Sequence, residues 1–435
     1  IINYYKVEKM PDYRKRKHSK LSSSPNRIKK SRIAQKTPSD DIKMSPSGRG
    51  KRSTTSSDMK VVKGRKLEKK KKFKIGAVVT AIIICAFLIL QVIFPAGIIE
   101  TLSTATALLG TGSYPIELES NETVNVMSSG SYYYILSNTH INAVSNSGKQ
   151  LFSYNHGYEN PILKVSSWGA LVFEQGGTEG LLFNAKKLKS TVKTEKPILS
   201  GAISDSGRYA LATLSDKYAS SVSVYSKNGD IVYEWYSAKD IVNNVLLSSN
   251  GKKLAVSTFD SSGGQYSSAI SVLGFESATP LHTEKFENTL VYTLDGSFRS
   301  RFAVVTDNKI KYIKWRGFKS SEYKSEYSTA FFRTGKGGYV TVFNRENDKT
   351  DNKITVFSKY GKQKAEFNYK GVVSDIAVYG NHIYCMNDTE IFLLDTDGKV
   401  LRKGVCGFGA VRFIPVSTNS VVVFTDNKIE SIKLN

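Results

Sequence analysis

Short runs of β-branched and aromatic residues, separated by Gly, Asn, Asp and Ser, dominate residues 114–435. Typical stretches are "GALVFEQ", "SSVSVYS" and "YVTVFN". Such runs of four to eight residues, bounded by turn formers, predict β-strands. No helical pattern longer than two turns interrupts this texture, so the sequence predicts an all-β body.

The predicted turns form two repeating sets, each marked by a glycine that supplies the positive φ of a tight hairpin. Glycines of the first set lie 44 and 45 residues apart, and those of the second lie 81, 132 and 37 apart. These intervals are multiples of a unit of about 40 residues, which is the length of a four-stranded propeller blade. The first set is Gly207, Gly251 and Gly296, and the second is Gly148, Gly229, Gly361 and Gly398.

The repeat predicts a β-propeller of eight four-stranded blades, with seven blades as the alternative. The last stretch has three strands, and residues 114–120, "YPIELES", are expected to add the fourth and so remove an exposed sheet edge. A β-sandwich is disfavoured because the repeat is too long. The predicted blades are 123–155, 162–195, 199–237, 243–286, 289–326, 329–369, 372–404 and 409–433 with 114–120.

Residues 75–94 carry no charge, and Thr80 and Gln91 are their only polar side chains. Twenty helical residues span roughly 30 Å, the thickness of the hydrocarbon core of a bilayer. The run therefore predicts an uncleaved transmembrane helix. Two alternatives stay open: cleavage of a signal peptide near the small-x-small stretch Ala105–Ala107, and a buried core helix.

Basic residues flank the apolar run on its N-terminal side, and Glu100 is the only charge between Phe94 and Tyr114. The positive-inside rule then places residues 1–74 in the cytoplasm and residues 114–435 across the membrane, joined by a short stalk at 95–113. The basic collar is also expected to contact anionic lipid headgroups. Its residues are Lys69, Lys70, Lys71, Lys72 and Lys74.

Charge is distributed unevenly along the chain, whose net charge is +24. Residues 1–74 hold 25 basic and six acidic side chains, whereas the remaining 361 residues hold 37 and 32. The tail is rich in Lys, Arg, Ser and Pro and is predicted to be disordered. Without interleaved aromatics it is not expected to bind nucleic acid. Its composition also suggests that translation begins at Met10 rather than Ile1.

Cysteine and histidine give no metal-binding pattern. The three cysteines form no CxxC pair, and the five histidines are scattered. Cys385 and Cys406 are expected to be separate thiols, with a disulfide between them as the alternative. No cofactor or metal is expected.

The order of these parts resembles a family of single-pass proteins of unknown function from clostridial-type Gram-positive bacteria, with an extracytoplasmic propeller like that of PQQ enzymes. The stretches that carry the resemblance are the tail with its apolar run, "GSYPIELES", "SGKQLFSYNHGYENPILKVSS", "ALVFEQGG" and "YSKNGDIVYEWYSAKD". It implies an envelope protein of an anaerobe, where exported disulfides are uncommon. The family has no assigned catalytic residues.

No catalytic motif stands out in the body. PQQ binding in the resembled fold uses a stacked tryptophan and a vicinal disulfide, but this chain has no Cys-Cys pair, so Trp168, Trp235 and Trp315 are expected to pack between blades. "RTGKGGY" (333–339) lacks the context of a phosphate loop and is interpreted as the opening of a strand. "DTDGK" (395–399) is interpreted as a hairpin turn rather than a calcium loop.

Aromatic residues give the remaining lead. Tyr132, Tyr133 and Tyr134 in succession must place rings on both faces of a sheet. Tyr233, Trp235 and Tyr236 are candidate contacts on the rim, with packing between blades as the alternative. The sequence thus favours a non-enzymatic scaffold or sensor that binds an envelope protein or a cell-wall polymer. The alternative is a propeller enzyme acting on glycans or peptides.

Overall fold

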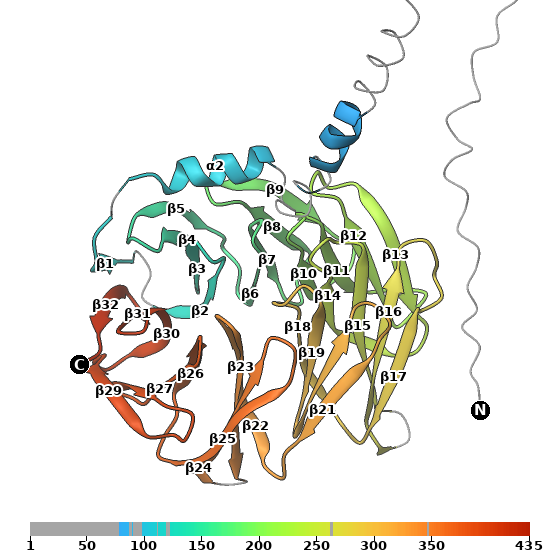
Figure 1. Ribbon diagram of the computed structural model, residues 1–435. Helices are drawn as coiled ribbons and strands as arrows, with labels where there is room; N and C mark the ends of the chain where they lie inside the picture. The colour runs from blue at the N-terminus through green and yellow to red at the C-terminus, as the bar shows by residue number, and fades with distance from the viewer. Residues whose placement is uncertain are drawn as a thin grey trace, which may run out of the picture. The chain divides into compact units, whose positions relative to one another are not determined.

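The computed structural model describes residues 78–86, 89, 98–110, 112–118, 122–261, 264–345 and 348–435. The chain divides into two units, Ile1–Ala86 and Phe87–Asn435. In the first unit, residues 78–86 are helical. Among its described residues, the second unit contains the helix α2 (Ile98–Leu108), followed by eight four-stranded antiparallel sheets that radiate from a central channel (Figure 1).

Each sheet is one propeller blade. Its strands run in chain order from the channel to the rim, except that the outermost strand of the last blade comes from the start of the propeller. The first four blades contain the following strands. Blade 1 is β2 (Thr123–Ser128), β3 (Tyr132–Ser137), β4 (His140–Ser145) and β5 (Gln150–Asn155); blade 2 is β6 (Pro161–Val165), β7 (Ala170–Glu174), β8 (Glu179–Phe183) and β9 (Leu188–Lys193); blade 3 is β10 (Ile198–Ile203), β11 (Tyr209–Leu214), β12 (Ser220–Tyr225) and β13 (Ile231–Ser237); blade 4 is β14 (Ile241–Leu247), β15 (Lys253–Asp260), β16 (Ser267–Gly274) and β17 (His282–Glu287).

The other four blades follow the same plan. Blade 5 is β18 (Val291–Asp295), β19 (Arg301–Thr306), β20 (Lys309–Lys314) and β21 (Ser320–Lys324); blade 6 is β22 (Ser328–Gly335), β23 (Gly338–Arg345), β24 (Asp348–Ser358) and β25 (Gln363–Lys370); blade 7 is β26 (Asp375–Tyr379), β27 (His382–Met386), β28 (Glu390–Leu394) and β29 (Val400–Val405); blade 8 is β30 (Ala410–Ser417), β31 (Ser420–Thr425), β32 (Lys428–Lys433) and β1 (Ile116–Glu117). Eight blades are therefore confirmed, and the seven-blade alternative is wrong.

The ring is closed by β1, which pairs antiparallel with β32 and forms the outer edge of blade 8. Ile116 lies opposite Ile429, and the Leu118 N–H donates to the Asn427 carbonyl at 2.7 Å. The predicted closing strand at 114–120 is thus confirmed, although β1 is only two residues long. It joins the two ends of the propeller in one sheet.

Each seam between neighbouring blades holds one apolar cluster. The Tyr132–Tyr134 run shows how a strand serves two seams. Tyr132 and Tyr134 pack between blades 1 and 2, whereas Tyr133 packs between blades 8 and 1 against Phe424, with ring centroids 5.3 Å apart. Because successive strand residues point to opposite faces, the run lines both seams, as predicted.

The three tryptophans occupy consecutive seams. Trp168 lies between blades 2 and 3, Trp235 between blades 3 and 4, and Trp315 between blades 4 and 5. All three are buried. Their expected role in packing between blades is confirmed.

The glycine turns close the hairpins between the first and second or the third and fourth strands of a blade. Because alternate strands run in opposite directions, all these turns lie on one face, which we call the glycine-turn face. The glycine has positive φ and donates its N–H to the carbonyl three residues back, as at Gly207 and Gly398. Gly296 is the exception, since its φ is not positive. There the Asp295 side chain accepts from the Ser297 N–H and shapes the turn instead.

Helix α2 (Ile98–Leu108) lies along the rim over β5 and β9 (Figure 1). Lys149 donates to the Ala107 carbonyl at 3.1 Å, and Lys186 donates to the Thr106 hydroxyl at 3.1 Å. A cation at a helix C-terminus also complements the helix dipole. The predicted stalk, residues 95–113, therefore contains a docked helix. Its several threonines gave no helical signal, and packing stabilises the helix instead.

Candidate binding site in the central channel

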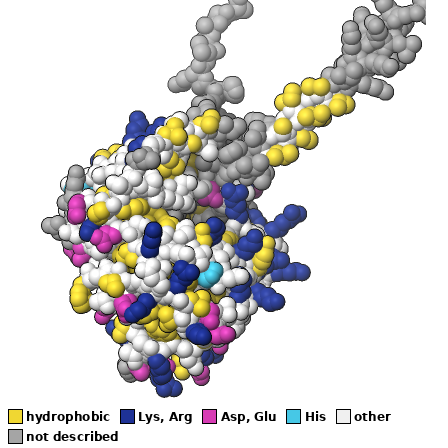
Figure 2. All heavy atoms as spheres, turned by 60° about the vertical axis from the view of Figure 1, so that its left-hand side comes forward, with side chains coloured by type: hydrophobic (Ala, Val, Ile, Leu, Met, Phe, Trp, Pro, Cys, Tyr) yellow, Lys and Arg dark blue, Asp and Glu magenta, His cyan; other side chains and the backbone are white. Residues whose placement is uncertain are grey.

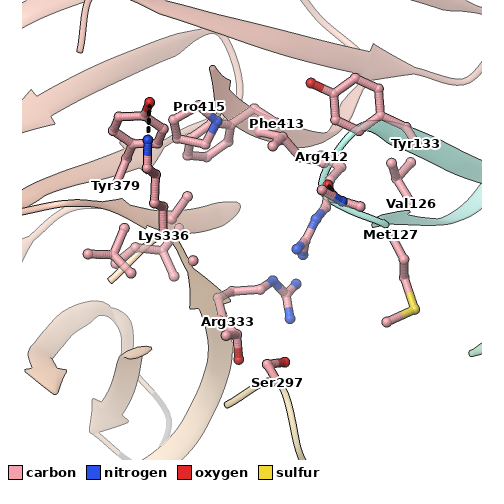
Figure 3. Close-up of a pocket in the computed structure, with 18 of the residues that line it drawn as sticks. Val126, Met127, Tyr133, Ser297, Arg333, Lys336, Tyr379, Arg412, Phe413 and Pro415 are labelled. Atoms are coloured by element: carbon pink, nitrogen blue, oxygen red, sulfur yellow. Dashed lines mark hydrogen bonds between the residues drawn. The ribbon is translucent and has the colours of Figure 1, made fainter. Parts of the chain in front are cut away.

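A cavity of about 870 Å³ occupies the half of the channel nearer the glycine-turn face (Figure 3). It is lined by the innermost strands of blades 1, 2, 5, 6, 7 and 8 and by turns on that face. This volume falls within the usual range of small-molecule sites, which is roughly 300–1,000 Å³. The cavity is the candidate functional site of the described residues.

A buried ion cluster joins three blades at the wall of this cavity. Arg333 of β22 donates from Nε to Asp375 Oδ1 of β26 at 2.9 Å, and Arg412 Nη1 of β30 lies 3.5 Å from the same oxygen. Asp375 Oδ2 accepts from the Phe413 N–H at 3.4 Å. The Asp375 side chain is only 1% exposed, so one carboxylate behind the cavity wall orients two guanidinium groups toward the open space (Figure 3).

Two more charged residues, Lys164 and Asp295, face the cavity from blades 2 and 5. Lys164 of β6 makes no hydrogen bond or ion pair with any described residue, and burial lowers its pKa, an effect that the charge of Asp295 partly offsets. The Asp295 carboxylate of β18 accepts from the Thr334 hydroxyl at 2.9 Å and from the Ser297 N–H at 3.0 Å. Burial also lowers the pKa of Arg412. For Lys164 and for Arg412, the nearby carboxylate therefore offsets only part of the cost of burying the positive charge.

Lys336, in the turn after β22, and Tyr379, the last residue of β26, contact each other at the glycine-turn end of the cavity. Lys336 Nζ donates to the Tyr379 hydroxyl at 3.0 Å and lies 4.6 Å from the centroid of that ring. Close by, a Cβ at Gly335 would lie 2.0 Å from the Val378 carbonyl oxygen. Only glycine permits this approach, which brings the two blades together at the rim of the cavity.

The opposite face carries the connections between blades, and we call it the connection face. Phe408, in the connection from blade 7 to blade 8, is 85% exposed. Each connection runs from the end of an outer strand to the start of the next inner strand, so all three kinds of position lie on this face. Exposed valines occupy such positions in the adjoining blades. This connection-face patch consists of Val124, Val372, Val405, Phe408 and Val411. Figure 2 shows apolar surface of this kind scattered among charged side chains on one side of the propeller.

The structure separates the three predicted rim aromatics. Tyr233 and Trp235 are buried between blades 3 and 4, and Tyr233 stacks on Phe275 with ring centroids 4.9 Å apart. Only Tyr236 reaches the surface, where it is 43% exposed beside Tyr218. The packing alternative therefore accounts for Tyr233 and Trp235, because alternate residues of β13 face the seam.

The predicted basic collar, Lys69, Lys70, Lys71, Lys72 and Lys74, lies outside the described residues. Of the predicted transmembrane segment at 75–94, residues 78–86 and 89 are described. Within the described part of the chain, no helix is both long enough and apolar enough to cross a membrane.

The cysteines and the "DTDGK" turn behave as structural elements. Cys385 and Cys406 are buried and free, and burial raises the pKa of both thiols. Asp395 accepts from the N–H groups of Asp397 and Lys399, both at 2.9 Å, so this loop is a hairpin turn as predicted. Across the described ranges, no group of His, Cys, Asp or Glu is arranged to hold a metal ion.

Sequence reasoning missed the residues of the cavity, although a signal exists. Arg333, Asp375 and Arg412 lie 42 and 37 residues apart, about one blade repeat each. Charged residues that recur at the blade period in inner strands occupy equivalent positions around the channel and so can come together there. The "RTGKGGY" stretch does lead into β23, as interpreted, but its Arg333 and Lys336 also line the cavity.

These features define an eight-bladed β-propeller whose central cavity carries an excess of basic groups. Residues 111–434 match the family of unknown function DUF5711, and the chain belongs to this family. The expected membership of a propeller family of unknown function is thereby confirmed.

Solved propellers share the fold at low sequence identity. Sqt1 of Saccharomyces cerevisiae is 11% identical with a TM-score of 0.52, and the match covers 75% of this chain and all of Sqt1. BamB of Moraxella catarrhalis is 13% identical, with a TM-score of 0.49. That match covers 74% of this chain and 99% of the BamB chain. Among curated proteins, none matches this chain significantly.

Proposed function

We propose that this protein is a non-enzymatic, membrane-anchored scaffold or sensor whose extracytoplasmic propeller binds an envelope protein through the connection-face patch. The exposure of Phe408 among four exposed valines carries the proposal. Soluble monomers rarely expose large contiguous apolar patches except at interaction sites. A hydroxyl-rich or anionic wall polymer would gain little from this surface, so a protein is the favoured partner.

Anchoring is supported by the sequence of the N-terminal unit. Residues 75–94 are uncharged and follow the basic collar, which favours a single pass with the tail in the cytoplasm. Only residues 95–97 separate this segment from α2, and three residues span at most about 11 Å. Because α2 is docked on the rim, such an anchor would hold the propeller close to the outer surface, in the Gram-positive envelope that the sequence resemblance implies.

Binding is favoured over catalysis by the state of the carboxylates in the cavity. Hydrolysis of glycans generally requires two carboxyl groups that flank the scissile bond. Asp295 and Asp375 instead accept hydrogen bonds from Thr334, Ser297, Arg333 and the Phe413 N–H. Among the charged groups of the cavity, those left available to a ligand are therefore cations.

Membrane extraction and protease access test the anchor. We expect the full-length protein to stay in the membrane pellet after alkaline washing, with the propeller open to protease added outside intact cells. A variant with the five collar lysines changed to glutamine should lose this uniform orientation. The matched variant Lys227→Gln/Lys252→Gln, at exposed positions in turns of the propeller, should keep it. Release by alkali from wild-type membranes would contradict the anchor.

Site-specific photo-cross-linking in cells tests the partner surface. A photo-reactive residue at position 408 should give one defined protein adduct, which Val411→Asp should diminish. The same residue at position 360, on the exposed Tyr360 of the glycine-turn face, is the matched control and should not give that adduct. Identical adducts from both positions, or adducts with lipid alone, would contradict a protein partner at the connection face.

A further inference from the structure

We propose that the central cavity binds an organic anion, whose carboxylate or phosphate group lies between Lys164 and the guanidinium groups of Arg333 and Arg412. This site is on the glycine-turn face and does not depend on the connection-face patch. Its ligand is a small molecule or the exposed end of a larger one, with an apolar portion beside the anionic group.

The first argument is the orientation of the two arginines. Asp375 lies behind them, 1% exposed, and it takes one nitrogen of each guanidinium group. Arg333 gives one further bond, from Nη1 to the Phe332 carbonyl at 3.3 Å, and Arg412 Nε makes no hydrogen bond among the described residues. Arg412 Nε is itself buried, but the Nη ends of both guanidinium groups are directed into the cavity from two blades (Figure 3). This arrangement suits a planar carboxylate or a phosphate.

The second argument is the charge balance of the cavity wall. Lys164, Arg333, Lys336 and Arg412 contribute four positive charges, against two from Asp295 and Asp375. Lys164 makes no ion pair with any described residue, and a partly buried cation without a directly paired counter-charge is costly. Burial lowers the pKa of both Lys164 and Arg412, so the charged form of each side chain is disfavoured there. A bound anion would supply the missing charge.

The third argument is the apolar remainder of the lining. Met127, Phe332 and Pro415 are partly exposed and line the cavity beside the charged groups, and Figure 3 labels Met127 and Pro415 among them. A cavity of about 870 Å³ is much larger than one inorganic anion and is partly apolar, so an inorganic ion alone would leave most of it unfilled. An amphipathic organic anion matches both parts of the lining.

The test is a thermal-unfolding titration of the full chain in detergent micelles at constant ionic strength. Three probes with one aromatic ring separate the chemistry: phenyl phosphate, benzoate and uncharged benzyl alcohol. Inorganic phosphate is the fourth probe. We expect phenyl phosphate or benzoate to raise the Tm saturably, with the larger effect identifying the preferred anionic group, and we expect benzyl alcohol to have no effect.

Variants separate a specific site from general ion effects. Lys164→Gln should weaken the apparent affinity at least tenfold while leaving the Tm without ligand unchanged or higher, because it removes a partly buried cation that makes no ion pair with the described residues. Lys196→Gln, in the exposed Lys196–Asp216 pair, is the matched control and should titrate like wild type. Arg412→Lys keeps the charge beside Asp375 and should bind more weakly because the planar fork is lost.

Two outcomes would overturn the proposal. The first is the absence of a saturable shift in wild type with any anionic probe. The second is an equal shift in wild type, Lys164→Gln and Lys196→Gln, which would show an unspecific ion effect. Neither outcome bears on cross-linking at position 408, so failure of the cavity site and failure of the scaffold function remain distinguishable.

Discussion

Arg333 Nε lies 2.9 Å from Asp375 Oδ1, and this contact joins blade 6 to blade 7 at the wall of the central cavity. Arg412 of blade 8 approaches the same carboxylate oxygen at 3.5 Å. A single buried carboxylate therefore links three consecutive blades. It also fixes the two cations that face the cavity, so the stability of this sector and its capacity to bind anions depend on one residue.

Asp375→Asn should strongly destabilise the propeller. The substitution preserves the shape of the side chain but leaves two partly buried guanidinium groups without their counter-charge, a change that costs about 3–5 kcal/mol when a buried pair is broken. Denaturant unfolding monitored by tryptophan fluorescence measures the free energy of unfolding. The control is Asp216→Asn, in an exposed ion pair with Lys196, which should cost less than about 1 kcal/mol. Equal stability of the two variants would refute a stabilising role for the buried cluster.

Gly207→Ala should destabilise the seam between blades 2 and 3. Gly207 has φ of +81°, and an added Cβ would lie 2.7 Å from Nε1 of the buried Trp168. Gly176→Ala is the matched control, since Gly176 has φ of +83° with nothing within 4 Å of its Cβ position. Both variants incur the cost of the left-handed conformation, about 1–3 kcal/mol. Only Gly207→Ala must also displace the indole ring.

We therefore expect Gly207→Ala to unfold at lower denaturant than Gly176→Ala and to shift the Trp168 fluorescence. Indistinguishable midpoints would show that the ring moves without cost.

The blades were predictable because their signals are local. Turn glycines in six of the blades, together with the runs of strand-forming residues, located every blade boundary to within three residues. The alternation along Tyr132–Tyr134 indicated that those rings fill the seams on both sides of the strand. The cavity was not found because it is assembled by closure of the ring. Lys164 and Arg412 are 248 residues apart, and only the topology brings their strands to one channel. Helix α2 was missed because its contacts with Lys149 and Lys186, rather than its own propensity, fix it.

Leu118→Ala should loosen the closure of the ring. Leu118 is buried beside Phe424 and Ile429 directly after β1, and removal of a buried leucine side chain generally costs about 2–5 kcal/mol. The weakened edge should also expose the hydrogen bonds of β32, because β1 is its outer neighbour. Hydrogen exchange measured by mass spectrometry should therefore rise in residues 428–433 before it rises elsewhere.

The control for closure is Leu401→Ala, on β29, where the side chain is half exposed. It should cost little and leave exchange in β32 unchanged. If Leu118→Ala lowers stability without faster exchange in β32, the two-residue strand β1 does not protect the edge of blade 8.

His156 should make the propeller less stable in mild acid. Its ring is buried between β5 and β6, Nδ1 accepts from the Tyr158 N–H at 3.0 Å, and Nε2 lies 3.1 Å from the Ser137 carbonyl. These contacts require the neutral ring protonated on Nε2, and burial lowers the pKa of His156 below its ordinary value near 6.5. The unfolded chain therefore binds a proton more readily than the folded chain as pH falls through 6.5.

The free energy of unfolding should accordingly decrease below pH 6.5, by at most about 1.4 kcal/mol per pH unit for one proton. His156→Gln should remove this component, so the difference in unfolding free energy between wild type and variant should shrink between pH 7.5 and pH 5. His382→Gln, at a partly exposed position at the start of β27, is the matched control and should follow the wild-type pH profile. The difference in unfolding free energy between wild type and His156→Gln could instead stay constant across this range. That result would show that His156 has the same protonation in the folded and unfolded chains. Its burial would then not set the acid sensitivity of the fold.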